Sequence, residues 1–282
     1  MPTPPPAPAR PLALLSNDDG VDSFFLLALA EALAASLEVV VVAPAEEQSW
    51  VGRAMTRHGE LVARRAGGFP CEAWSLTGRP ADCVNVGLHH LLGGRRPAVV
   101  VSGMNLGYNA TLNLTLGSGT VAAATEGALA GLPAVAFSLS IPPDEFERVA
   151  AARGRRGAEW DAVTRAAAAR CRDLTLELLA ESPTSWERSG GLSHVVHNVN
   201  LPARVDAHTP VVHTTLARGP MPSLFERLDG GEEEGVARLR FGFARAWDYT
   251  YLPEDADLAA LRAGAISRCA LDWARVASPG AR

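Results

Sequence analysis

Two adjacent carboxylates, Asp18 and Asp19, directly follow a short apolar stretch near the start of the chain. The stretch 12–16 predicts a buried strand, and Gly20 allows the chain to turn behind the acidic pair. Neighbouring carboxylates repel each other unless a cation or a proton neutralises them. Joined by a hydroxyl and an amide oxygen, they would form an all-oxygen shell that suits Mg²⁺ or Mn²⁺ and disfavours zinc. The same stretch is also compatible with an Asx turn, in which Asp19 or Asp22 caps the next helix.

A second group of candidate residues lies in the stretch LGSGTVAAATEG, residues 116–127. Its small residues allow close approach of a ligand to the backbone, and the helix predicted after them would direct free N–H groups outward. Ser118 and Thr120, on either side of Gly119, add hydroxyl donors. The sequence therefore predicts an anion site, although an ordinary serine or threonine helix cap fits the same residues. No G-x-G-x-x-G fingerprint of a dinucleotide site follows a strand here.

The elements that position these residues alternate between β-branched runs and alanine-rich stretches, a pattern typical of a parallel α/β sheet. The predicted strands are 12–16, 38–44, 61–63, 73–76, 98–103, 133–139, 194–202 and 211–216. The predicted helices are 22–36, starting at Asp22 or Ser23, then 80–92, 120–131, 158–181 and 256–263. A glycine-rich loop is expected between 103 and 119, and two hairpin strands on either side of a turn at 230–235.

Ligands of open parallel sheets bind outside the carboxyl ends of the strands. Asp18 and Asp19 follow the first predicted strand, Ser49 follows the second, and Asn105 follows the strand at 98–103. The segment 117–120 precedes a helix at the same edge. A cation site beside an anion site indicates a phosphate ester as the ligand.

Composition excludes several classes of function. The net charge is −5, so no basic surface for duplex nucleic acid is expected. All 26 basic residues are arginine, which excludes a lysine Schiff base and a Walker A loop. Four widely spaced cysteines predict reduced thiols in the cytoplasm. No apolar run is long enough for a membrane span, and the start MPTPPPAPAR does not read as a signal peptide.

The chain is expected to have three parts. Residues 1–10 form a proline-rich, disordered tail. Residues 11–218 form the α/β catalytic core. Residues 219–282, where the pattern weakens, form a C-terminal extension that serves as an oligomerisation arm.

Several ordered blocks resemble one protein family. They are LLSNDDGVDS, VVVVAPAEEQSWVGRAMT, LTGRPADCVNVGL, VVVSGMNLGYN and GSGTVAAATEGALAGLPAVAFSL, which together fall within residues 12–139. The later HNVNLP, residues 197–202, is a weaker match. These blocks are similar to motifs of the SurE survival proteins, metal-dependent phosphatases of nucleoside monophosphates.

The resemblance implies a doubly wound, mostly parallel, Rossmann-like α/β core whose C-terminal hairpin arm helps to build homodimers or homotetramers. It implies one divalent cation per subunit, Mg²⁺ or Mn²⁺, held by Asp18, Asp19, Ser49 and Asn105. It also implies a phosphate pocket lined by Asn109, Ser118, Gly119 and Thr120.

The chain departs from the family pattern in two places. The stretch 110–117 is one residue longer than usual and places Gly117 where the family has tyrosine. The usual C-terminal G-Y-V-S-x-T-P-L appears as GAISRCAL, residues 264–271.

The predicted function is hydrolysis of a phosphate monoester, a nucleoside 5′- or 3′-monophosphate, with Asp18 or Asp19 orienting or deprotonating a water. One alternative is a nucleotide- or phosphate-binding protein with weak or no turnover, and another is a phosphatase for a different small metabolite. A nicotinamide-dependent oxidoreductase is a third alternative, against which the missing glycine fingerprint counts.

Overall fold

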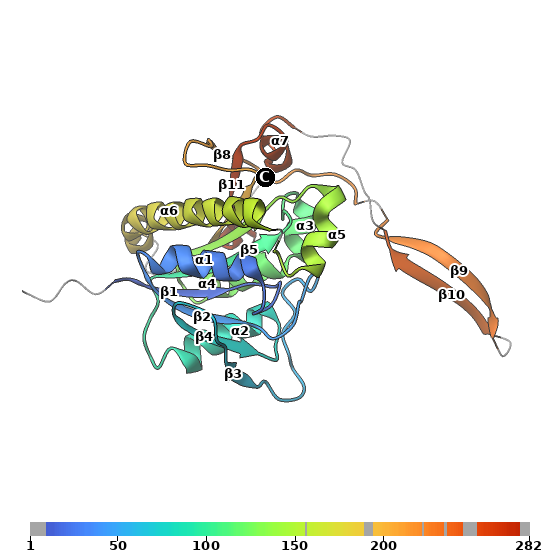
Figure 1. The fold of residues 1–282 in the computed structure, drawn as a ribbon, viewed down its shortest axis with the longest axis horizontal. Coiled ribbons are helices and arrows are strands. Elements are labelled where there is room, and N and C mark those ends of the chain that lie inside the picture. Colours follow the sequence, from blue (N-terminus) through green and yellow to red (C-terminus); the bar gives the residue numbers. More distant parts are fainter. Residues whose placement is uncertain are drawn as a thin grey trace, which may run out of the picture.

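The computed structural model describes residues 10–155, 157–188, 194–221, 223–233, 236–244 and 253–276. Within these residues a nine-stranded sheet lies between two layers of helices, and a two-stranded arm projects away from it (Figure 1). The predicted tail at 1–10 lies outside the described residues except for Arg10, which donates to the Ala34 carbonyl at the end of the first helix.

The strands of the main sheet follow the order β3-β4-β2-β1-β5-β6-β7-β11-β8. Their bounds are β1 Leu12–Ser16, β2 Glu38–Pro44, β3 Ala63–Arg65, β4 Glu72–Leu76, β5 Val99–Leu106, β6 Ala134–Leu139, β7 Val195–Leu201, β8 Val211–His213 and β11 Ile266–Asp272. The chain runs from β1 out to β2 and β4, and then returns to place β5 on the other side of β1. The predicted doubly wound, mostly parallel sheet is therefore confirmed, with its switch point between β1 and β5.

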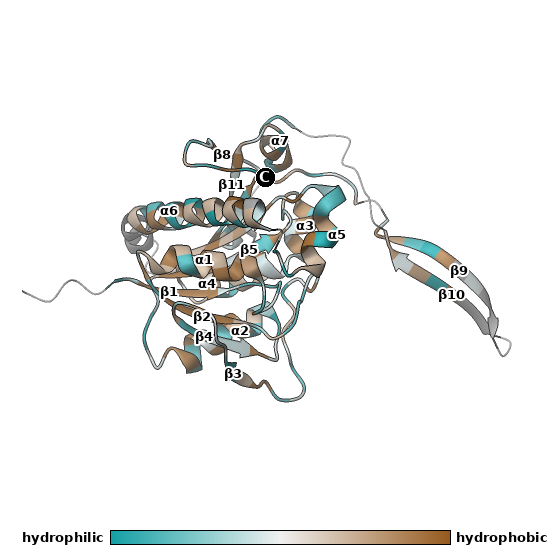
Figure 2. Ribbon diagram, viewed as in Figure 1, coloured by the Kyte–Doolittle hydropathy of each residue, from teal (hydrophilic) through white to brown (hydrophobic). Residues whose placement is uncertain are grey.

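The helices divide between the two faces of the sheet. Their bounds are α1 Phe24–Ala34, α2 Pro80–Val86 continuing as a π-helical turn η1 Gly87–Leu91, α3 Leu112–Gly117, α4 Gly119–Leu129, α5 Pro143–Ala151, α6 Ala158–Arg188, α7 Asp257–Arg262 and α8 Trp273–Val276. Helices α1 and α6 pack on one face of the central strands, and α2 and α4 on the other. Figure 2 shows hydrophobic residues along α1 and the central strands, and hydrophilic ones on α5.

The alternation of side chains along the strands explains this division. In β1, Ala13 and Leu15 face α1, whereas Leu12 and Leu14 face α2. Both sets are apolar because helices cover both faces, and such strands read as continuous hydrophobic runs. The four consecutive valines at 39–42 of β2 have the same explanation, because they are buried on both faces of the sheet.

One predicted loop and one predicted strand need correction. The glycine-rich segment at 103–119 is not a continuous loop, because β5 continues to Leu106 and Leu112–Gly117 form helix α3. The Thr111 hydroxyl accepts a hydrogen bond from the Leu114 amide, which starts this short helix. The strand predicted at 211–216 is shorter and spans only Val211–His213.

The C-terminal extension predicted at 219–282 includes a strand of the main sheet. Strand β11 lies between β7 and β8, antiparallel to the first and parallel to the second. Its buried Cys269 and Leu271 pack against Val196 of β7 and against α4, and this apolar contact draws the segment into the sheet.

The predicted hairpin is present as the projecting arm. Strands β9 Phe225–Glu233 and β10 Val236–Phe243 pair antiparallel and extend away from the sheet (Figure 1). The strands therefore reach into the turn predicted at 230–235, of which residues 234 and 235 lie outside the described part of the chain.

Among the described helices, none combines the length and the apolar character that crossing a lipid bilayer requires.

Candidate active site

Asp18 and Asp19 lie directly behind β1, at the switch point of the sheet. Asp18 is almost fully buried, and the Thr120 hydroxyl donates to its Oδ1 over 2.6 Å. The Oδ2 atom of Asp19 accepts a hydrogen bond of 2.9 Å from the Leu106 amide at the end of β5. The acidic pair therefore joins the first strand to β5 on one side and to the start of α4 on the other.

The environment of these two carboxyl groups favours their neutral forms. Burial raises the pKa of Asp18 to about 6, although the bond from Thr120 acts in the opposite direction. Burial, and next the charge of Asp18, raise the pKa of Asp19 well above its usual range. No salt bridge to either group is present among the described residues. A bound cation would relieve the desolvation and repulsion that raise these pKa values.

The Asx turn considered for this stretch does not form among the described residues, and the turn after β1 is held by the Asn17 side chain instead. The Asn17 side-chain amide donates to the Gly20 carbonyl over 2.9 Å. Helix α1 begins after Ser23, which makes no side-chain capping bond, and Asp19 accepts its bond from Leu106. Gly20 has φ +92°, and a Cβ atom there would lie 3.2 Å from the Glu46 carbonyl carbon. This turn therefore requires glycine and packs against the loop that follows β2.

Ser49 lies in that loop, and the structure brings its backbone beside Asp18. The Gln48 amide donates to the Asp18 carbonyl over 2.8 Å, so the preceding residue is fixed at the acidic pair. Ser49 itself is exposed, and its amide donates to Glu47 Oε1 over 2.7 Å. The structure thus places Ser49 at the same edge of the sheet as Asp18, without a direct contact between the two side chains.

Asn105 lies in β5, one residue before the amide that donates to Asp19. Its side-chain amide donates to the Gly107 carbonyl over 2.7 Å, which orients the group and leaves Oδ1 for another partner. The pairing of β5 with β6 shifts by one residue between Ser102 and Asn105. Gly103 occupies this bulge with φ +125°, where a Cβ atom would collide with the Phe137 carbonyl. The bulge turns β5 so that Asn105 reaches the site.

The predicted phosphate pocket surrounds the start of α4. Ser118 is the N-cap of this helix, and its hydroxyl accepts from the Val121 amide over 3.1 Å. Gly119 lies against Asp18, where a Cβ atom would be 2.7 Å from the Asp18 Cβ. Thr120 is completely buried and contacts Asp18. The positive end of the helix dipole therefore faces the acidic pair, and it favours negative charge there.

Asn109 is held at the same place by strands β6 and β7. Its side-chain amide donates to Ser138 Oγ over 2.9 Å and to Thr120 Oγ1 over 3.4 Å. Its backbone amide donates to Asn200 Oδ1 over 2.7 Å, and its carbonyl accepts from Asn198 Nδ2 over 2.8 Å. The structure thus brings Asn109 and Thr120 together.

Sequence reasoning missed several buried polar residues beside these groups: Ser16, Ser102, Ser138, Asn198 and Asn200. Each lies an even number of residues from an apolar residue of the face that packs on α2 and α4, such as Val100, Ala136 or Val196, and therefore shares that face. The signal was a polar residue at every second position near the carboxyl end of a hydrophobic strand, as in HNVNL. Ser16 Oγ, Ser102 Oγ, Asn198 Oδ1 and Asn200 Nδ2 have no hydrogen-bond partner among the described residues.

The loop after β2 is fixed to the helices of this face at several points. Arg53 forms an ion pair of 2.6 Å with Glu126 of α4, whose other oxygen accepts from Asn85 of α2. The Thr56 hydroxyl donates to Asp82 over 2.7 Å. These contacts hold the loop that carries Ser49 against α2 and α4.

Trp50 lies between this loop and the projecting arm. Its ring contacts the Phe243 ring of β10 edge-on, with 5.3 Å between the centroids. On its other side, a Cβ atom at Gly117 would lie 3.2 Å from Trp50 Cε3. The indole therefore fills space that a side chain at 117 would need, one residue before the phosphate pocket.

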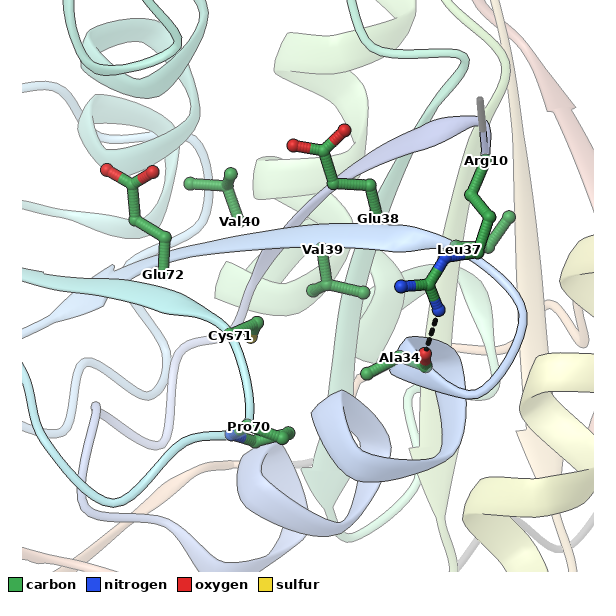
Figure 3. Close-up of a pocket in the computed structure, with 9 residues that line it drawn as sticks. All are labelled: Arg10, Ala34, Leu37, Glu38, Val39, Val40, Pro70, Cys71 and Glu72. Atoms are coloured by element: carbon green, nitrogen blue, oxygen red, sulfur yellow. Dashed lines mark hydrogen bonds between the residues drawn. The ribbon is translucent and has the colours of Figure 1, made fainter. Parts of the chain in front are cut away.

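A separate cavity of 240 Å³ lies at the opposite end of the sheet (Figure 3). It is lined by the first residues of β2 and β4, Glu38 and Glu72, together with Arg10 and Cys71. Glu38 pairs with Arg95, and Glu72 with Arg65 over 2.7 Å. This cavity contains none of the predicted site residues, and its carboxylates are already neutralised by arginines.

The described residues contain no cluster of three or more histidine, cysteine, aspartate or glutamate side chains that could hold a metal. A site of the predicted type contributes only two carboxylates, and its other ligands are a hydroxyl and an amide.

Comparison with known proteins gives consistent matches. A family model described as survival protein SurE matches residues 13–220. The chain is 46% identical over 132 residues to the 5′-nucleotidase SurE of Cytophaga hutchinsonii, covering 46% of this chain and 51% of that protein. It is 36% identical over 207 residues to the 5′-nucleotidase SurE of Methanocella arvoryzae, covering 73% of this chain and 72% of that protein. The match to the first of these relatives therefore spans about half of its length.

A structural match covers more of the chain. The crystal structure of the SurE protein from Aquifex aeolicus superposes with a TM-score of 0.66 and 27% sequence identity, over 93% of each chain.

Proposed function

The chain belongs to the SurE survival protein family, and from that premise we propose that it is a divalent-metal-dependent phosphatase of phosphate monoesters. The proposed substrates are nucleoside 5′- or 3′-monophosphates. The relatives from Cytophaga hutchinsonii and Methanocella arvoryzae carry the name 5′-nucleotidase, which supports this substrate class. The observation that carries the proposal is the pair of buried Asp18 and half-buried Asp19 at the N-terminal end of α4. An acidic pair that binds a cation, next to a helix end that binds an anion, suits a phosphate group.

The residues at the site fit a divalent cation. Burial and mutual repulsion raise the pKa of both aspartates, and a cation would offset both effects. The amide oxygen of Asn105 and the hydroxyl of Ser49 would complete an oxygen shell with the two carboxylates, of the kind that Mg²⁺ or Mn²⁺ prefers. We propose one such cation per subunit. When bound, it would neutralise charge on the phosphate and lower the pKa of a water molecule.

The chain's own groups would bind the phosphate and activate the water. The N–H groups at the start of α4 would bind phosphate oxygens, the Ser118 hydroxyl would add a donor, and Thr120 would line the pocket and hold Asp18 beside it. Asn109, fixed by Ser138 and Asn200, would orient the phosphate through its side-chain amide. Asp18 or Asp19 would orient the attacking water and accept its proton. The Arg53–Glu126 pair would keep the Ser49 loop in place over the site.

The test is a phosphate-release assay with nucleoside 5′- and 3′-monophosphates and small phosphate esters, in Mg²⁺, Mn²⁺ or Co²⁺ and in EDTA. Release should depend on the cation, and Asp19→Asn should abolish it without unfolding the protein. Asp22→Asn is the matched control, because Asp22 is exposed and three residues away. Full turnover by Asp19→Asn, or release unaffected by EDTA, would contradict the proposal. Nucleotide binding without release in all three metals would instead favour a binding protein.

We also propose that the protein assembles into a homodimer or homotetramer through its arm. The arm exposes large apolar side chains that a partner subunit could cover: Phe225, Leu228, Leu239, Phe241 and Phe243. Phe241→Ser should shift the sedimentation coefficient toward that of the monomer. A wild-type protein that sediments as a monomer at all concentrations would contradict this assembly.

The cytoplasm is the proposed compartment. All four cysteines are unpaired in the structure, and three of them are buried, which suits a reducing environment.

A further inference from the structure

Asp257, the first residue of α7, lies 146 residues after Thr111 in sequence but beneath the loop that carries Asn109. Its side chain is completely buried. Its Oδ2 accepts from the Thr111 amide over 2.7 Å, and its Oδ1 accepts from the Ala217 amide over 3.0 Å and the Leu258 amide over 2.8 Å. Only the bond from Leu258 lies within α7, so the carboxylate links α7 to two other segments.

The residue that Asp257 holds has an unusual backbone. Thr111 has φ 74° and ψ 154°, a region that glycine alone adopts without strain. A β-branched residue persists there only where its surroundings hold it in place. The Thr111 N–H bond to Asp257 provides that restraint, and the next amide, of Leu112, donates to the Ala217 carbonyl over 2.9 Å.

The same helix also holds the residue before Thr111. Ala110 is buried against Leu258 and Leu261 of α7. Asn109 comes directly before Ala110, and its carbonyl accepts from Thr115 Oγ1 over 3.0 Å. A continuous set of contacts therefore runs from α7, through 111 and 110, to the side chain that reaches Thr120.

We propose that Asp257 is a positioning residue for phosphate binding. It holds Thr111 in a conformation otherwise open only to glycine, and so sets the position of Asn109 in the phosphate pocket. This inference rests on the proposed function, because that function gives Asn109 its phosphate.

The first variant is Asp257→Asn, which leaves one acceptor oxygen for three amide donors. Amide hydrogen exchange at residues 111–114 should become at least 10-fold faster. The dissociation constant for inorganic phosphate, measured by calorimetry in Mg²⁺, should rise at least 10-fold while thermal unfolding stays cooperative. Asp255→Asn is the matched control, because that carboxylate is exposed two residues before the same helix and, within the described part of the chain, accepts only from the Thr215 hydroxyl. The control should change neither the exchange rates at residues 111–114 nor the dissociation constant for phosphate.

The second variant adds Thr111→Gly to Asp257→Asn. Glycine adopts the backbone conformation of residue 111 without restraint, so phosphate affinity should return to within 3-fold of that of Thr111→Gly alone. A general loss of packing around α7 would not be rescued in this way. If Asp257→Asn does not fold, the double variant should fold, and failure of both would overturn the inference.

Two results separate this inference from the proposed function. Unchanged phosphate affinity and unchanged exchange in Asp257→Asn would refute the positioning role, whatever the enzyme hydrolyses. Phosphate binding that responds as expected, without release of phosphate from any nucleotide or ester, would uphold the positioning role and refute the phosphatase.

Discussion

The Thr120 hydroxyl donates a 2.6 Å hydrogen bond to Asp18, across 102 residues of sequence. This bond joins the end of the first strand to the first turn of α4, and both groups are buried. It fixes the distance between the proposed cation site and the proposed phosphate site. Substrate geometry should therefore depend on it.

Thr120→Val should lower kcat/KM for phosphate release about 100-fold, because it removes the hydrogen bond that positions Asp18 while keeping the side-chain shape. Thr120→Ser keeps the hydroxyl and should stay within about 5-fold of the wild type. The unfolding temperature of both variants provides the control for folding. Equal activity of the valine and serine variants would show that the hydroxyl has no such role.

The contribution of the acidic pair to the stability of the metal-free protein should fall as pH rises. The pKa of Asp18 is raised from 3.8 to about 6 in the folded protein, so its contribution to stability is complete below pH 3.8 and is lost as pH rises through 6. The raised pKa of Asp19 extends this loss to higher pH. Urea unfolding in EDTA between pH 4 and 7.5 should show Asp18→Asn becoming the more stable protein, by a difference of the order of 3 kcal/mol at neutral pH.

A saturating divalent cation should reverse that difference, because binding to the folded state alone stabilises it. Parallel stability curves for the wild type and Asp18→Asn in EDTA would refute the burial effect.

Glu126→Gln should loosen the loop that carries Ser49. The variant loses the ion pair between the largely buried Glu126 and the exposed Arg53, so its free energy of unfolding should fall by about 1 kcal/mol. It should lower kcat/KM several-fold and raise the cation concentration needed for half-maximal activity. Glu145→Gln, which breaks the exposed pair with Arg148, is the control. It should leave kcat/KM and the cation requirement unchanged. An unaltered cation requirement in Glu126→Gln would separate this ion pair from the site.

Gly117→Tyr should destabilise the protein by about 1–3 kcal/mol, because Trp50 already occupies the space beside residue 117. Adding Trp50→Gly should recover at least half of that loss, since it opens the space and suits the φ of 60° at position 50. A double-mutant cycle by urea unfolding, which includes Trp50→Gly alone, measures the coupling. Additive effects would show that the two positions do not share this space.

Much of the fold could be predicted because helices cover both faces of the central sheet. The continuous valines of β2 and the alternation around them locate the strand to the residue. Strand β11 could not be located in this way, because Arg268 and Ser267 interrupt its apolar pattern. Its place depends on contacts with β7, 71 residues away at His197, and such pairing leaves no local trace.

The site likewise combines residues that local sequence predicts with residues that depend on long-range contacts. Asp18, Asp19 and Thr120 lie next to turns and caps, where local sequence indicates both position and chemistry. The binding of all four proposed metal ligands to one ion stays a prediction. Asn200 and Asp257 act through long-range hydrogen bonds to the backbone of 109 and 111. Neither forms a motif with its partner, so only the folded structure reveals the pair.

The place of β11 also has a consequence for synthesis on the ribosome. Strand β7 keeps an open edge until residues 266–272 leave the exit tunnel, and β8 pairs with nothing but β11 in the described sheet. Nascent chains that stall before this point would present an unpaired edge to one another, which favours aggregation. Completion of the sheet must therefore wait for the synthesis of residues 266–272.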